Sequence, residues 1–598
     1  MHSFHIPVMG LGFTVDTPVK VAPFGISSVI SIVDDNLIEK MREYYCNKIG
    51  IPYSAISEKM KDFRAERITN YLNLIDRIVT EKFEEIKNSI SDRIGTKDDI
   101  QKYMDLLPDY SEVKKKFNEL LENGTTLKKD IQAWIKDNIN IGSIDVNIMT
   151  KLDAENYIDD EALPIEFNDA HAALRGFANS NLSSSLVLSA GMNPRLYSYL
   201  EKFDDFYPDS TGMLRKKIIL KVSDYRSAII QGKFLAKKGI WVSEFRIESG
   251  LNCGGHAFAS DGFLMGPILE EFKNRREELI ETIHKILVEA LKSKNRAIPG
   301  HPMNIKITAQ GGVGTNNEHH FLLDYYELQS VGWGTPFLLV PEVVNVDNDT
   351  LELLRDAKES DLYLSNISPL GVPFNSVRNN SQDLDKQELI NKGRPGSSCP
   401  KKYLVSNKEF TKISICTASR QYQNLKIKEL EAKDLPESEK KAAYSKIVDK
   451  ACLCIGLANA ALLKNNLEIK GTNTGVSVCP GPNMAYFDKI LTLKQMVDHI
   501  YGRANYIDEE KRPNFFVKEL QVYIDYLRNL IEENGTVISD KQAKYFETFK
   551  DNLCDGIEYY KKLYSSYKDK YSHFKGDFMQ EIEHLHNELC SIFMVKHE

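Results

Sequence analysis

The chain has 598 residues, of which 42% are hydrophobic and 27% charged, and its formal net charge is −8. This length exceeds one ordinary core, so we expect two or three domains, or one barrel with large insertions. The acidic balance and the lack of a basic leader or a run of about 18 apolar residues predict a cytoplasmic protein with neither nucleic acid nor membrane as partner.

The first 33 residues predict a strand, a glycine turn, a short helix and a second strand. The strand in IPVMGLGF runs into glycines, and Pro18 and Gly25 suit the first turn and the end of a helix. A parallel α/β barrel can begin in this way. A core strand followed by a tight turn explains the same residues without a ligand.

Residues 34–182 are predicted to be a helical insertion. Apolar side chains recur there at steps of three and four: Ile68, Leu72, Ile75, Val79, Phe83, Ile86 and Ile90. A barrel tolerates such an insertion between a strand and its next partner, because both ends emerge on one face. It could cover an active site or mediate subunit contacts.

The barrel pattern resumes near residue 183. One strand ends at Gly191, and another over Ile218 to Val222 precedes the N-cap residues Ser223 and Asp224 of a helix that ends at Gly239. The next strand, IWVSEFRIESG, leads into LNCGGHAF. Its His256 stands where a barrel enzyme performs chemistry, and an imidazole pKa near neutral suits proton transfer. A lone histidine is more often structural.

Two glycine turns follow strand-like segments in the last part of the barrel. Ile305 and Ile307 alternate before Gly311 and Gly312, and Ser330-Val331 leads to the sequence Gly332-Trp333-Gly334-Thr335. A (β/α)₈ barrel uses the loops after its seventh and eighth strands to hold a phosphate on backbone amides. A Gly-Gly turn alone is commonly an ordinary turn.

Together these segments resemble the flavin barrels of the nitronate monooxygenase (2-nitropropane dioxygenase) family. The similarity rests on AQGGVG and SVGWGTPFLL, on the GGH strand end, and on a closing turn at Gly371, Pro373, Arg378 and Asn379. LMGPILEEFKNRR is similar to the enoyl-reductase branch that serves polyketide and polyunsaturated fatty acid synthases. The resemblance spans residues 1–33 and 183–380, and a three-residue extension before Gly254 departs from the family pattern.

The resemblance implies an FMN site with His256 acting on a small-molecule substrate. In the family the two glycine loops hold the FMN phosphate and the first strand lies under the ring. Its cofactor-binding residues are then expected to be Met9, Gly10, Gly12, Lys221, Gly254, Gly255, Gln310, Gly311, Gly312, Gly332, Gly334 and Thr335.

A cysteine-containing extension over 381–500 and a helical C-terminal region over 501–598 follow the barrel. Five of the nine cysteines fall in the extension: Cys399, Cys416, Cys452, Cys454 and Cys479. Thiolates from separated loops can hold an iron–sulfur cluster or zinc, but no CxxC pair is present, and buried cysteines are common.

The predicted fold is therefore a (β/α)₈ TIM barrel with a helical insertion and an α-helical C-terminal region. The predicted function is that of an FMN-dependent oxidoreductase, which oxidises a carbanion-like substrate or reduces an activated double bond. Two alternatives stay open: a flavin-free phosphate-binding isomerase or lyase, and a non-catalytic barrel scaffold. The substrate and the formation of a homo-oligomer also stay open.

Overall fold

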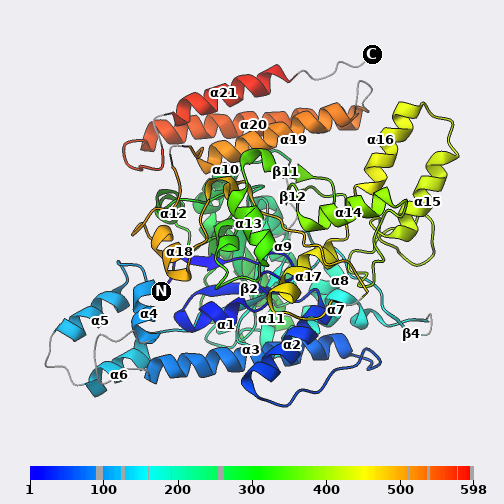
Figure 1. Cartoon of the computed structure of the whole chain (residues 1–598). Helices are drawn as coiled ribbons and strands as arrows, with labels where there is room; N and C mark the ends of the chain where they lie inside the picture. The colour runs from blue at the N-terminus through cyan, green and yellow to red at the C-terminus, as the bar shows by residue number, and fades with distance from the viewer. Residues whose placement is uncertain are drawn as a thin grey trace.

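A closed barrel of eight parallel strands forms the centre of the molecule (Figure 1). The structure is a computed structural model that describes residues 1–88, 99–122, 128–158, 161–189, 191–252, 261–469, 471–509, 511–534, 539–574 and 577–592. The barrel strands are β1 (Phe4–Ile6), β2 (Ser27–Ser31), β3 (Ile144–Ile148), β6 (Ser185–Leu188), β7 (Lys217–Val222), β8 (Val242–Glu248), β9 (Lys306–Gln310) and β10 (Ser330–Gly332). Each pairs with the next, and β10 pairs with β1 to close the ring, which confirms the predicted (β/α)₈ barrel.

The strands are short apolar runs because both of their faces are buried. One set of side chains faces the helices and belongs to the main core, as Ile218 and Leu220 do on β7. The alternate set, Val29, Val187 and Ile219, forms a small cluster with Val8 that is separate from the main core. This is the arrangement expected for an inner layer of side chains contributed by different strands of a barrel.

Helices surround the barrel and return the chain to its N-terminal end. Asp224 caps α9 by accepting a hydrogen bond from the Ser227 amide, and Gly239 follows the helix with a φ of +80°. Both positions confirm the predicted helix limits. The surrounding helices are α1 (Thr17–Val21), α7 (Asp169–Ala178), α8 (Pro194–Tyr199), α9 (Tyr225–Lys237), α10 (Met265–Asn274), α11 (Arg276–Ser293), α12 (Asn316–Asp324) and α13 (Asn348–Asp356).

The third barrel strand lies inside the segment that the sequence assigned to the helical insertion. β3 pairs with β2 and β6, so the insertion ends before Ile144 rather than at residue 182. Along β3, Ile144, Val146 and Ile148 alternate with other residues, which is the signal of a strand. In the sequence this signal was outweighed by the charged helices that precede it. The insertion helices are α2 (Asp35–Ile49), α3 (Phe63–Asn88), α4 (Asp99–Leu106), α5 (Glu112–Glu122) and α6 (Lys128–Asn138).

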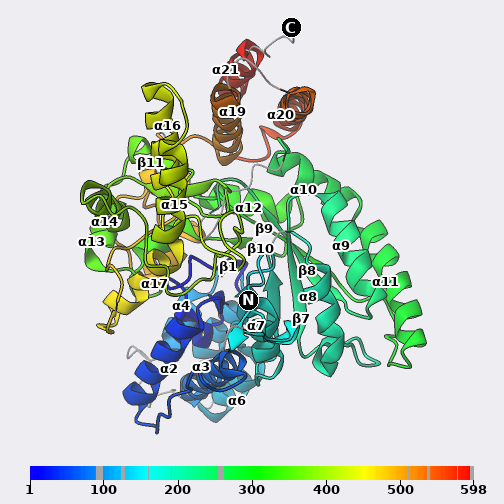
Figure 2. The ribbon, with the colours of Figure 1, turned by 90° about the vertical axis from the view of Figure 1, so that its right-hand side faces the viewer.

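The remaining elements flank the barrel on other sides. Figures 1 and 2 show the insertion helices at one side, α19 to α21 at the opposite side, and α15 and α16 projecting from the body. Within the described ranges, no helix has both the length and the apolar character of a membrane span. These elements are the hairpins β4 (Tyr157–Ile158) with β5 (Glu161–Ala162) and β11 (Leu362–Ser365) with β12 (Phe374–Val377), and the helices α14 (Ser381–Asn391), α15 (Arg420–Glu431), α16 (Glu437–Val448), α17 (Leu453–Lys464), α18 (Leu493–Ile500), α19 (Phe515–Asn534), α20 (Asp540–Tyr567) and α21 (Phe578–Ser591).

Candidate active site at the C-terminal ends of the barrel strands

A carboxylate at the end of β8 gathers polar side chains from neighbouring strand ends. Glu248 Oε1 accepts hydrogen bonds from Lys221 Nζ at 3.1 Å, Gln310 Nε2 at 2.6 Å and Asn252 Nδ2 at 2.7 Å. Lys221 and Glu248 are largely buried, so their ion pair is only weakly screened by solvent. The sequence predicted Lys221 and Gln310 but missed Glu248 and Asn252. Glu248 could have been found, since it lies near the end of a predicted strand.

The two glycine loops lie side by side after β9 and β10. Gly332 pairs with Gln310 across these strands, so the turns that follow both emerge at the same rim. In the described part of the chain, no hydrogen bond uses the amides of Gly311, Gly312, Val313, Gly334 or Thr335 as donors. Four of these residues are buried and Gly334 is half-buried. Buried amides without an acceptor are costly, and such donors can bind the oxygens of an anionic group.

The extension and the C-terminal region hold the carbonyl side of the first glycine loop. Asn483 Nδ2 donates to the carbonyl oxygens of Gly312 and Val313 at 2.6 and 2.9 Å. Arg512 Nη2 donates to the Gly312 carbonyl at 2.7 Å. Because C=O and N–H point in opposite directions across a trans peptide, fixing the Gly312 carbonyl turns the Val313 amide away from Arg512.

A buried ion pair anchors this contact. Arg512 Nη1 donates to Glu318 Oε1 at 2.6 Å, and Arg512 Nε donates to Asn483 Oδ1 at 2.9 Å. The other carboxylate oxygen of Glu318 accepts from the amides of Gly314 and Thr315, where α12 begins with a capping box. All donors of the network meet acceptors, which is the condition under which a buried ion pair is tolerated.

The second glycine loop is also tied to the extension. The Gly481 amide donates to Thr335 Oγ1 at 3.1 Å. A Cβ on Gly481 would lie 2.5 Å from the Leu251 carbonyl oxygen and 2.7 Å from Thr335 Oγ1, so only glycine fits between the segment after β8 and the second glycine loop. Gly332 is equally constrained, since a Cβ there would lie 2.5 Å from Gln310 Cβ.

The cofactor-binding residues predicted at the first strand follow β1 in a turn region. Met9 is buried, and its amide donates to Thr14 Oγ1 at 3.2 Å. Gly10 has a φ of +56°, and the Gly12 amide donates to the Leu457 carbonyl of α17 at 3.0 Å. A Cβ on Gly12 would lie 2.9 Å from that carbonyl oxygen, so packing against α17 requires this glycine. Cofactor binding by Met9, Gly10 and Gly12 stays a prediction.

Gly254, Gly255 and His256 lie outside the described residues, but both ends of their segment are held by the C-terminal helices. Glu519 accepts from Ser249 Oγ at 2.6 Å and from the Met265 amide at 2.9 Å. Tyr523 and Tyr560 accept from the amides of Gly250 and Gly266. Burial raises the pKa of Glu519 to about 7.

Four of the five predicted metal ligands lie together, and the fifth lies elsewhere. Cys399, Cys416, Cys452 and Cys454 are brought together beside α17. Cys479 is buried two residues before Gly481, whose amide reaches the second glycine loop. Cavities of about 1180 and 870 Å³ lie away from the candidate active site, the first next to Cys399 and Cys416 and the second at the N-terminal ends of the barrel strands.

No protein-family model matches the chain, and no curated protein matches it. Among solved structures, it is similar to the enoyl reductase domain of MlnA from the macrolactin biosynthesis cluster of Bacillus amyloliquefaciens, with 15% identity, a TM-score of 0.30, and coverage of 71% of this chain and 88% of that one. It is also similar to nitroalkane oxidase from Streptomyces ansochromogenes, with 11% identity, a TM-score of 0.32, and coverage of 83% and 95%. The function proposed below is argued from the residues of this chain.

Proposed function

We propose that the protein is an FMN-dependent oxidoreductase whose cofactor phosphate is held by the two glycine loops. The observation that carries the proposal is the set of buried amides at Gly311, Gly312, Val313 and Thr335 that donate no hydrogen bond within the described chain. A phosphate monoester supplies several acceptor oxygens and a negative charge to such donors. The loops therefore fit the phosphate end of FMN.

Side chains at neighbouring strand ends fit the rest of such a ligand. Lys221, held by its ion pair with Glu248, places an ammonium hydrogen-bond donor at the rim of the barrel, which can contact electron-rich groups near it. His256 is assigned to the substrate, where it would hold or transfer a proton. FMN would supply the electron transfer when bound, and the protein orients the substrate and controls its protons.

The substrate class follows from this chemistry. A flavin enzyme with a nearby proton-transfer group can oxidise a carbanion-like carbon next to a strongly electron-withdrawing group, or reduce a double bond activated by such a group. Both reactions move electrons at a carbon that can carry negative charge. Lys221 suits either direction, because its ammonium N–H groups can donate to electron-rich groups.

Comparison of FMN with riboflavin tests the phosphate assignment. Calorimetry on flavin-free protein should give at least 100-fold tighter binding for FMN, because riboflavin lacks the phosphate that the amides bind. Equal affinities would contradict the assignment. Tight binding of a phosphorylated sugar by protein that binds neither flavin would support the isomerase or lyase alternative, which the same amides also fit.

A further inference from the structure

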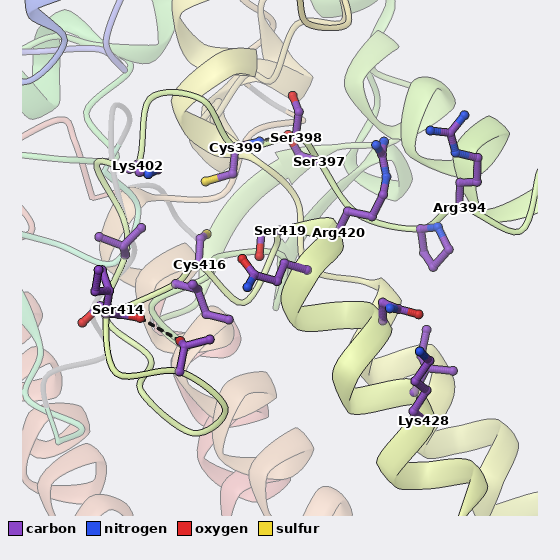
Figure 3. A pocket seen from close by; sticks show the side chains of 18 of the residues that line it. Arg394, Ser397, Ser398, Cys399, Lys402, Ser414, Cys416, Ser419, Arg420 and Lys428 are labelled. Atoms are coloured by element: carbon purple, nitrogen blue, oxygen red, sulfur yellow. Dashed lines mark hydrogen bonds between the residues drawn. The ribbon is translucent and has the colours of Figure 1, made fainter. Parts of the chain in front are cut away.

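Four cysteines from three segments of the extension meet at one place. Cys399 lies in the loop after α14, Cys416 precedes α15, and Cys452 and Cys454 stand at the start of α17. Main-chain bonds join the first two segments, with the Ser397 amide donating to the Ala418 carbonyl at 2.9 Å. Figure 3 shows Cys399 and Cys416 on these facing loops, beside the adjoining cavity.

Their thiols form a chain of mutual contacts. The Cys399 thiol interacts with those of Cys416 and Cys452, and the Cys452 thiol also interacts with that of Cys454. All four side chains are buried and none forms a disulfide. Hydrophobic burial alone does not require four thiols from distant segments to face one another, and a disulfide would join only two of them.

Further donors point at this group of sulfurs. The amides of Ala418 and Ile455 lie near the sulfurs of Cys416 and Cys452 and favour their thiolate forms, while the Ile455 amide donates to the Cys452 carbonyl oxygen at 3.3 Å. Ser397 also hydrogen-bonds to Cys452 through its side chain. Donors of this kind stabilise thiolate sulfur, the form in which cysteine binds metals.

The close approach of the thiols favours a single ion over a cluster. Zinc–sulfur bonds of about 2.3 Å at tetrahedral angles place the four sulfurs about 3.8 Å apart, close to mutual contact. In a cubane cluster each cysteine binds a different iron, so the cluster core would hold the thiols apart. Among the described side chains, no three His, Cys, Asp or Glu are yet arranged around one point that would hold a metal ion. Binding therefore requires the thiols to lose their protons and turn from one another toward a common centre.

We propose that Cys399, Cys416, Cys452 and Cys454 bind one structural Zn²⁺ ion as four thiolates. Four thiolates and one Zn²⁺ carry a net charge of about −2. Basic residues lie near the site: Lys401 Nζ donates to the Cys454 carbonyl at 3.4 Å and pairs with Asp34, and the cavity beside Cys399 is lined by Arg394, Lys402, Arg420 and Lys428 together with Glu431. These cations offset the charge of the centre.

The site would hold the start of α17 against the barrel. Along that helix, the Leu457 carbonyl accepts from Gly12, and the Gly456 carbonyl accepts from the Ser477 amide at 3.1 Å. The segment after Ser477 continues to Gly481 and Asn483, which contact the two glycine loops. The metal would thus fix the support of the candidate active site without taking part in its chemistry.

Metal analysis of the full-length protein, purified without a metal-binding tag, tests this inference. We expect about one zinc and little iron per chain, and X-ray absorption at the zinc edge should give four sulfur neighbours at about 2.3 Å. Iron near four per chain would overturn the single-ion assignment. Zinc and iron both below about a tenth per chain after purification in zinc-containing buffer would overturn the site itself.

Serine variants provide the matched comparison. Cys452→Ser should lower zinc to well below half an ion per chain, whereas Cys46→Ser, a buried cysteine on α2, should keep the full amount. Equal zinc in both variants would contradict the assignment. If Cys452→Ser does not fold, the absorption measurement on the unaltered protein decides the matter. Zinc content does not depend on FMN, so this result is independent of the proposed function.

Discussion

Arg512 donates a hydrogen bond from Nη2 to the carbonyl oxygen of Gly312 at 2.7 Å, across 200 residues of sequence. It joins the C-terminal region to the loop that would bind the cofactor phosphate. With Asn483 it fixes the carbonyl side of this loop, so that the amide side is left for a ligand. The C-terminal additions therefore complete the candidate site rather than merely covering the barrel.

Asn483→Ala should weaken cofactor binding while the fold is retained. It takes the donor from the Val313 carbonyl, while Arg512 still donates to the Gly312 carbonyl, and an unmet buried acceptor costs about 1–3 kcal/mol. FMN affinity should fall roughly 10-fold or more. Calorimetry with FMN measures the change, and Asn505→Ala, at an exposed asparagine, is the control. Equal FMN affinity in the two variants would show that Asn483 does not position the loop.

Gly334→Val should yield folded protein with little bound FMN. Gly334 has a φ of −108°, so a side chain there adds bulk at the amides without the strain of a positive φ. Gly312 is a poorer site for this test, because its φ is +84° and a Cβ there would lie 2.6 Å from Leu251 Cδ1. Gly300→Val, with open space around its Cβ, is the control. Full FMN occupancy in Gly334→Val would refute the loop assignment.

His256→Asn should leave FMN bound and slow the reaction with substrate. A general acid–base group contributes on the order of 10²–10⁴-fold to the rate. Stopped-flow measurement of flavin reduction and reoxidation, together with flavin content per chain, separates the two effects. Loss of flavin with unchanged rates in the remaining loaded fraction would assign His256 to cofactor retention instead.

Glu519→Gln should flatten the dependence of stability on pH. Burial raises the pKa of Glu519 in the folded protein to about 7, above the 4.5 of an ordinary glutamate. The folded state therefore binds this proton more tightly, and stability falls as the pH rises from about 4.5 to about 7, by roughly 3 kcal/mol at most. Glutamine carries no titrating proton, so the thermal midpoint of the variant should lack this decline.

The exposed residue Glu289 on α11 gives the control for that experiment, as Glu289→Gln. This variant should follow the pH dependence of the unaltered protein. If Glu519→Gln keeps the same slope between about pH 5 and pH 7 as Glu289→Gln, Glu519 is not the group responsible.

Local patterns in the sequence predicted most of the barrel but only part of the site. Apolar runs ending in glycine or cap residues located the strands around β7, β9 and β10, because burial on both faces and turn geometry are local requirements. β3 was missed, although Ile144, Val146 and Ile148 alternate, because long charged helices precede it. Asn483 and Arg512 carry no sequence signal, since their partner Gly312 lies 171 and 200 residues away.

For the cysteines, too, the sequence predicted only part of what the fold shows. Their spacing matches no metal motif, because Cys399, Cys416 and Cys452 come from separate segments that only the folded extension brings together. Sequence proximity grouped Cys479 with them, whereas the fold places it two residues before Gly481, whose amide contacts the second glycine loop. Spacing predicts a metal site only where the ligands share a turn or a hairpin.

The absorption spectrum of freshly purified, anaerobically handled protein tests the central claim most directly. We expect flavin bands from about one FMN per chain, released on denaturation and identified by its mass, and a loss of these bands in Gly334→Val. Folded protein that carries no flavin and takes up none when supplied with excess FMN would contradict the account.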